Sequence, residues 1–88
     1  MKIRGDFIIH RIADDIVAIP VGNAALEFNG MLLLNEVSKV IWDCLERECD
    51  LPGIVTAVTD AFDVSAEEAE ADIIEFLQKL RSAHFLEE

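Results

Sequence analysis

Apolar and polar residues alternate along two short segments near the start of the chain. Residues 7–12 and 16–21 are rich in β-branched and aromatic side chains, and the turn-forming residues 13–15 separate them. Strand alternation divides the first segment into two faces, with Phe7, Ile9 and Arg11 on one and Ile8, His10 and Ile12 on the other. This pattern predicts two strands joined as an antiparallel hairpin.

A four-residue apolar run then leads directly into an amphipathic helix. Residues 31–34 are all apolar and predict a short buried strand, and Asn35 follows at the position of a helix N-cap. Beyond it the apolar residues recur with the spacing of one helical face, at Val37, Val40, Ile41, Cys44 and Leu45. Trp42 falls outside this stripe, so two interpretations stay open: a half-buried packing residue, or part of a surface that docks a partner.

Capping signals predict two further helices. Asp50, with Pro52 in the first turn, begins one of them. Ser65 and Glu68 form a capping box that begins the other. The apolar stripe of this last helix is Ala69, Ile73, Phe76, Leu77 and Leu80. Residues 84–86 should fold back so that one of their apolar side chains is buried against the helices.

Residues 24–30 allow two interpretations. Asn29-Gly30 is a favourable two-residue hairpin turn, which would make residues 25–28 a strand paired with residues 31–34. Because the segment begins with two alanines, which are weak strand formers, the alternative is a loop. In the simplest three-stranded meander, residues 31–34 lie at the edge of the sheet in both cases. An edge strand offers unpaired backbone groups to another chain.

The order of these elements predicts an α+β fold of winged-helix type: a small three-stranded antiparallel sheet followed by three helices. A chain of 88 residues with 52% hydrophobic content suits one core, so we expect a single domain over residues 1–88.

The net charge of the chain limits the classes of partner that it can bind. The formal net charge is −11, from 18 acidic and 7 basic residues, so a polyanion would be repelled over most of the surface. Nucleic-acid binding is therefore not expected, and a peptide or protein partner is favoured. No apolar run has the length of a signal peptide or a membrane span, which predicts a cytoplasmic protein that does not enter a membrane.

No catalytic or metal-binding pattern is visible. Cys44 and Cys49, taken as residues of one helix, point about 140° apart, which is poor geometry for a disulfide. Cys44 is then a small buried hydrophobe and Cys49 a free thiol near the helix end. His10 has no recognisable nucleophile or paired carboxylate beside it, so it is interpreted as an ordinary strand residue. We therefore expect no enzyme activity, no catalytic residue, no metal and no cofactor.

Two sets of residues stand at spacings that are typical of a known family. They are Leu34-Asn35 followed by Ile41-Trp42, and Asp72 followed by Phe76-Leu77 and Leu80. With the order of the elements, they resemble the PqqD family, the precursor-peptide chaperones of coenzyme PQQ synthesis and related RiPP recognition elements. The resemblance covers nearly the whole chain. One departure is His84, where such sequences often have a glycine that ends the helix in a left-handed turn.

The resemblance implies a non-catalytic peptide chaperone. Members of the family bind the leader segment of a ribosomally made precursor peptide as an added strand and present it to a modifying enzyme, often a radical SAM maturase of the SPASM type. Carried onto this sequence, the peptide-binding edge consists of Gly30, Met31, Leu32, Leu33 and Leu34. The helical wall beside it consists of Asp72, Ile73, Phe76, Lys79 and Leu80.

These residues have different roles in the prediction. Ile73, Phe76 and Leu80 lie on the apolar stripe and are interpreted mainly as packing residues whose edges touch a ligand. Asp72 and Lys79 flank the stripe and are better candidates for polar contacts. Met31 and Leu33 share one face of their strand and Leu32 and Leu34 the other, and the sequence does not decide which pair faces the helices.

A second hypothesis is a winged-helix module that acts in transcription through protein contacts or weak DNA binding. The acidic last helix argues against it, because a recognition helix needs lysine and arginine to face phosphates. The oligomeric state is left open as a monomer or a weak dimer, because a free strand edge can also serve dimerisation.

Overall fold

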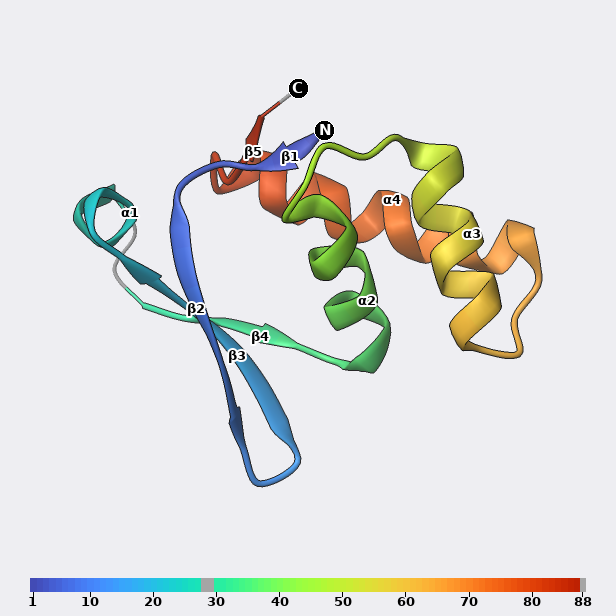
Figure 1. Ribbon diagram of the computed structural model, residues 1–88, viewed down its shortest axis with the longest axis horizontal. Coiled ribbons are helices and arrows are strands. Elements are labelled where there is room, and N and C mark those ends of the chain that lie inside the picture. Colours follow the sequence, from blue (N-terminus) through green and yellow to red (C-terminus); the bar gives the residue numbers. More distant parts are fainter. Residues whose placement is uncertain (28–29, 88) are drawn as a thin grey trace.

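The computed structural model describes residues 1–27 and 30–87. Its elements follow the chain as β1 (Lys2–Ile3), β2 (Asp6–Ile12), β3 (Asp15–Val21), α1 (Asn23–Glu27), β4 (Leu32–Leu34), α2 (Glu36–Leu45), α3 (Leu51–Ala61), α4 (Ala66–Ser82) and β5 (Leu86–Glu87). Figure 1 shows α2, α3 and α4 gathered on one side, with the β2–β3 hairpin projecting away from them as a wing.

The predicted hairpin and meander are confirmed. β2 and β3 pair in antiparallel register from Asp6 opposite Val21 to Ile12 opposite Asp15, and β4 pairs antiparallel with β3. The strand order is β2–β3–β4, so β4 lies at an edge of the sheet as predicted. The α+β, winged-helix-like fold class is therefore confirmed.

The structure decides which face of the edge strand meets the core. Leu34 is 3% exposed and Leu32 is half-buried, whereas Leu33 is 66% exposed. Leu34 stands opposite Ile16, which is also buried. Leu32 and Leu34 therefore point towards the helices, and Leu33 points away from them.

The segment before β4 differs from both sequence interpretations. Residues 23–27 form the short helix α1, so the strand proposed over residues 25–28 is wrong for its first three residues. Ala24 is buried, and a Cβ placed on Gly5 would come within 3.1 Å of the Ala24 Cβ. The helix is thus held against the chain that enters β2. Residue 28, the last of the proposed strand, and Asn29, the first of the proposed turn, lie outside the described residues.

All three predicted N-caps form. The Asn35 side chain accepts a hydrogen bond from the Ser38 N–H at 2.8 Å, and that of Asp50 accepts one from the Gly53 N–H at 2.9 Å. Ser65 Oγ accepts one from the Glu68 N–H at 3.1 Å. Each bond satisfies a backbone donor that the first turn of a helix leaves unpaired, which fixes the helix start.

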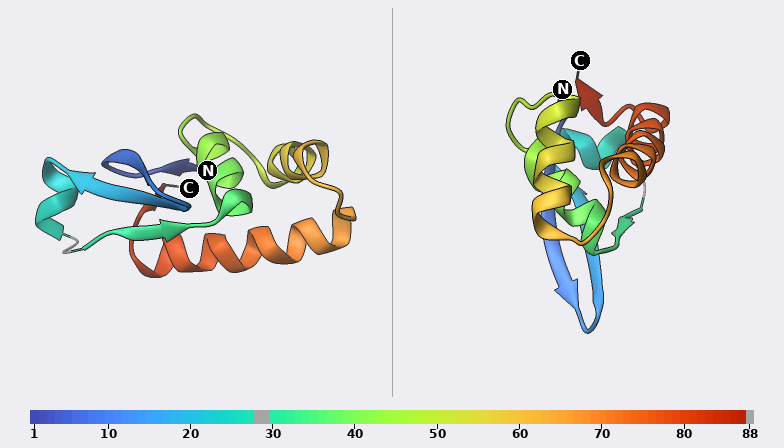
Figure 2. Two further views of the ribbon diagram at one scale, coloured as in Figure 1. Left: turned by 90° about the horizontal axis from the view of Figure 1, so that it is seen from below. Right: turned by 90° about the vertical axis from the view of Figure 1, so that its right-hand side faces the viewer.

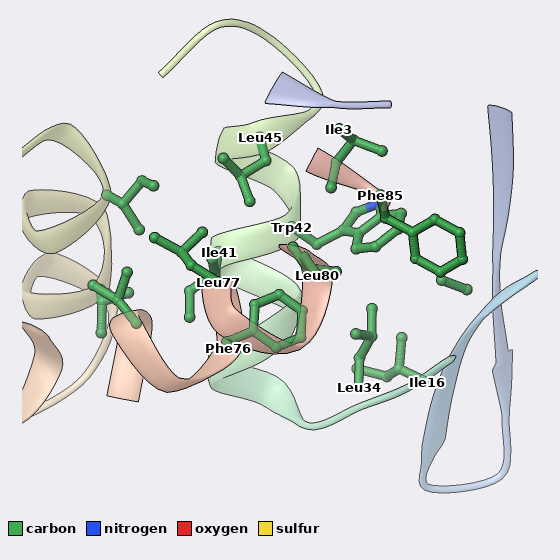
Figure 3. Packing of buried hydrophobic residues seen from close by; sticks show 14 of the residues in the cluster. Ile3, Ile16, Leu34, Ile41, Trp42, Leu45, Phe76, Leu77, Leu80 and Phe85 are labelled. Carbon is green, nitrogen blue, oxygen red and sulfur yellow. The ribbon is translucent and has the colours of Figure 1, made fainter. Parts of the chain in front are cut away.

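Trp42 is a core residue, 1% exposed, and not part of a docking surface. Its ring meets Phe7 edge-on, with centroids 5.0 Å apart, and Phe7 meets Phe85 in the same way at 4.9 Å. Figure 3 shows Trp42 and Phe85 together beside Ile3, at the end of the core nearest the sheet. A cluster of three aromatic rings therefore joins β2, α2 and the C-terminal tail.

The tail folds back as predicted, and it does so through a left-handed residue. His84 has φ of 63°, the Phe85 N–H donates to the Leu80 carbonyl at 2.9 Å, and the His84 N–H donates to the Arg81 carbonyl at 3.0 Å. This is the Schellman arrangement, formed here without the usual glycine. Phe85 is buried, and β5 then pairs with β1 in a two-stranded ribbon that the sequence analysis did not predict.

Candidate functional site

One edge of the three-stranded sheet carries no partner strand among the described residues. β4 pairs with β3 along one side only, and its other side is the sheet boundary. The alternate backbone N–H and C=O groups of an edge strand are the groups that a further strand would bond. The edge extends back over Gly30 and Met31, which are both exposed.

A groove lies between the start of α2 and the middle of α4, close to the point where β4 enters α2. Its volume is about 240 Å³, and its lining is Asn35, Val37, Ser38, Ile41, Asp72, Glu75, Phe76 and Lys79. A shallower hollow continues from it along α4 over Glu75, Gln78, Lys79, Ser82 and Ala83. Both views in Figure 2 show the C-terminal half of α4 beside β4 and the start of α2. The free edge and the groove therefore adjoin.

The predicted helical wall divides into a lining part and a supporting part. Asp72, Phe76 and Lys79 line the groove. Ile73 and Leu80 are 0% and 1% exposed, so their side chains are enclosed in the core behind the wall. On the strand, the side chain of Leu33 is exposed and that of Leu34 is buried. Leu34 therefore offers a ligand at this edge only its backbone groups.

Several lining residues were missed by the sequence analysis. Glu75 lies with Asp72, Phe76 and Lys79 at the i, i+3, i+4, i+7 spacing of one helical face, a signal that was available in the sequence. The lining residues of α2 had a weaker signal. Because β4 passes directly into α2, the first turn of that helix, which contains Val37 and Ser38, must lie beside the strand edge.

The exposed lining of the groove is mainly polar. Phe76 is 6% exposed and Ile41 is 1% exposed, so the apolar side chains beneath the groove offer little surface to a ligand. Asp72, Glu75 and Lys79 take part in none of the ion pairs Met1–Glu48, Arg4–Glu27, Arg11–Glu36 and Lys39–Asp43. Two carboxylates and one ammonium group of the lining are therefore available to a ligand.

The two cysteines do not share a helix, which corrects the sequence analysis. α2 ends at Leu45, and Cys49 lies in the following segment, where the chain brings it back beside Cys44. Both are free thiols and both are half-buried. Burial, and then the neighbouring Cys49 thiol, raise the pKa of Cys44, so its thiol is protonated at neutral pH and is a weak nucleophile.

The described residues contain no group of three or more His, Cys, Asp or Glu side chains arranged to hold a metal ion. Across the same part of the chain, no helix is long and apolar enough to cross a membrane.

The chain is similar to known proteins over most of its length. The family model of coenzyme PQQ synthesis protein D (PqqD) matches residues 11–86. A search of curated proteins found no match. Among solved structures, the chain is similar to TbiB1, described as TbiB1 in complex with the TbiA(beta) leader peptide, with a TM-score of 0.74 and 26% sequence identity. That likeness covers 99% of this chain and 95% of TbiB1.

Proposed function

Because the chain belongs to the PqqD family, we propose that it is a peptide chaperone that binds the leader segment of a ribosomally made precursor peptide. The leader adds as a strand to the free edge of β4 and occupies the groove beside α4. The observation that carries this proposal is the unpaired edge of β4 directly beside a charged groove. A TbiB1 structure that contains a leader peptide supports it.

The edge and the wall are similar in length. The helical wall from Asp72 to Ala83 runs for about 16 Å at about 1.5 Å per residue. The edge from Gly30 to Leu34 runs for about 13 Å at about 3.3 Å per residue. A leader strand of about five residues would therefore bond to the whole edge while lying along most of the wall.

The groove supplies specificity where the backbone bonds do not. In an added strand, alternate side chains point to the same face, so every second leader residue would point into the groove. Such a residue meets Asp72, Glu75 and Lys79 on α4, with the half-buried side chain of Val37 opposite them on α2. Ile73 and Leu80 act from behind, because they hold α4 in place against the core.

The chain itself performs no chemistry in this proposal. It delivers the bound precursor to a modifying enzyme, and the PqqD resemblance points to a radical SAM maturase as that enzyme. Because the leader is held by a binding domain separate from the enzyme, the enzyme can modify other parts of the same precursor while the leader stays bound.

The test is an NMR titration of the whole chain with synthetic leader peptides from candidate precursor genes near its own gene. We expect one of them to cause amide shifts at residues 31–34 and along residues 72–83, and small shifts on α3, which lies away from the groove. Spectra unchanged by every candidate leader, both alone and with a candidate maturase, would contradict the proposal.

A further inference from the structure

The face of the sheet that points away from the helices is largely apolar and lies outside the hydrophobic core. The register places Ile8 opposite Ile19, His10 opposite Val17, and Val17 opposite Leu33 on this face. None of the apolar residues on it packs against the hydrophobic core, whereas Phe7 and Ile9 on the inner face do. We call this surface, made of Ile8, His10, Ile12, Val17, Ile19 and Leu33, the outer sheet face.

Val17 on the central strand of this face is buried, at 4% exposed, but apolar side chains on the two strands beside it are well exposed. Ile8 is 52% exposed, Ile12 is 53% exposed and Leu33 is 66% exposed. Met31, which alternation places on the same side as Leu33, is 59% exposed. Among the described residues, the other large exposed apolar side chains are Leu26 on α1 and Ile74 on α4. Exposed apolar residues are thus gathered here, which is typical of a surface that a protein partner covers.

The charged residues that the register places on the outer sheet face are acidic. Strand alternation places Asp6 on the same side as Ile8, and Asp15 stands opposite Ile12 at the wing tip. Asp14, in the turn, is also exposed. Arg11, the basic residue of β2, is on the inner side and pairs with Glu36. A matching surface must therefore be apolar in the centre and basic at its rim.

A second copy of the chain does not meet that requirement. Each copy carries a formal net charge of −11, and a symmetric pair would bring the same acidic rims together. Like charges placed against one another in an interface oppose association. The charge complementarity thus favours a different protein with a basic rim.

The outer sheet face also continues into the proposed leader site. Leu33 belongs both to this face and to the free edge strand. A leader strand added to β4 would extend the sheet, and its alternate side chains would stand in the same plane as Leu33. A partner seated on the outer sheet face would then touch the chain and the leader together.

We infer that the outer sheet face is the docking surface for the modifying enzyme, which meets it with an apolar patch edged by lysine and arginine. This inference rests on the proposed function. It implies that the loaded leader strengthens enzyme docking, because the leader completes the contact surface.

The test separates the two sites with substitutions on β2, the strand farthest from the leader edge. The variants are Ile8→Lys and Ile12→Lys, and the matched control is Leu26→Lys, on α1, where the native leucine is 85% exposed. Each is compared with the wild-type chain in two assays: anisotropy of the labelled leader peptide, and calorimetric binding to the purified enzyme encoded beside the precursor. Exposed sites of this kind tolerate substitution with little effect on stability.

We expect the β2 variants to keep leader affinity within about twofold and to lose enzyme affinity by about tenfold or more, with Leu26→Lys unchanged in both assays. Enzyme affinity retained by both β2 variants, with leader binding intact, would overturn the inference and leave the proposed function standing. Sedimentation of the wild type as a dimer that Ile8→Lys separates would also overturn it, in favour of a second copy. Absence of leader binding by the wild type would instead contradict the proposed function.

Discussion

His84 occupies a left-handed backbone position that glycine would occupy with less strain. It takes the left-handed conformation, φ of 63°, that ends α4 and directs Phe85 into the core. A side chain with a Cβ is disfavoured in that region, and glycine is not. The resemblance to a family that often has glycine here identified the position, and the structure shows that histidine forms the same turn.

We therefore expect His84→Gly to raise the free energy of unfolding by about 1 kcal/mol, because the strain at the left-handed position disappears. The control is Ala83→Gly, since Ala83 has an ordinary helical φ of −89° and gains nothing from glycine. Thermal and urea unfolding of the two variants measure the effect. A destabilised His84→Gly variant would show that the histidine side chain contributes more than the strain costs.

Glu75 offers a way to close the groove without disturbing the core. It is exposed and lines both the deep groove and the shallow hollow along α4. Glu75→Trp should fill the groove and weaken leader binding by about tenfold or more, with stability changed by less than about 0.5 kcal/mol.

The matched control is Glu70→Trp, because Glu70 is an exposed acidic residue of the same helix that does not line the groove. Fluorescence anisotropy with a labelled leader peptide compares the two variants. Equal affinities would place the leader elsewhere on the molecule.

At the scale of elements, β4 and α4 are two halves of one proposed site. β4 provides backbone groups at the sheet edge, and α4 provides a wall with Asp72, Glu75, Phe76 and Lys79. Neither element is sufficient alone. The strand edge by itself would bond to any strand without specificity, and the helix face by itself offers a peptide no backbone hydrogen bonds.

If the leader adds as a strand, the effect of N-methylation on leader binding should alternate from one leader residue to the next. Only alternate peptide residues direct their N–H groups towards β4, so N-methylation of those residues should abolish leader binding. N-methylation of the intervening residues should reduce affinity much less. A series of leader peptides, each methylated at one position and measured by calorimetry, gives the pattern. Losses that recur every three or four residues would indicate a helical leader instead.

At the scale of the whole molecule, charge separates this chain from the nucleic-acid-binding winged helices that share its layout. The wing and helices are present, but the net charge is −11 and Glu67, Glu68, Glu70, Asp72 and Glu75 are on α4. Phosphate groups would be repelled along the helix that would have to approach them.

We therefore expect no retardation of duplex DNA by the chain in a mobility-shift assay at physiological salt. A shift that weakened as salt rose would favour the transcription-related alternative. The same preparation should bind the leader peptide, which controls for the folded state of the chain.

The sequence by itself determined the elements whose signals are local. The β2–β3 hairpin followed from strand alternation, and the starts of α2, α3 and α4 followed from Asn35, Asp50 and Ser65, because a cap bonds to backbone groups only a few residues away. The position of β4 at the sheet edge also followed, since a meander pairs strands in sequence order.

Only the tertiary structure decided the features that depend on distant partners. Trp42 is buried because Phe7 and Phe85, far away in the sequence, close around it. β1 and β5 exist as strands because the two ends of the chain meet. The inward direction of Leu34 likewise depends on the core beneath the sheet, which no local pattern specifies. The groove and the outer sheet face belong to this second group, because each is formed by segments that folding brings together.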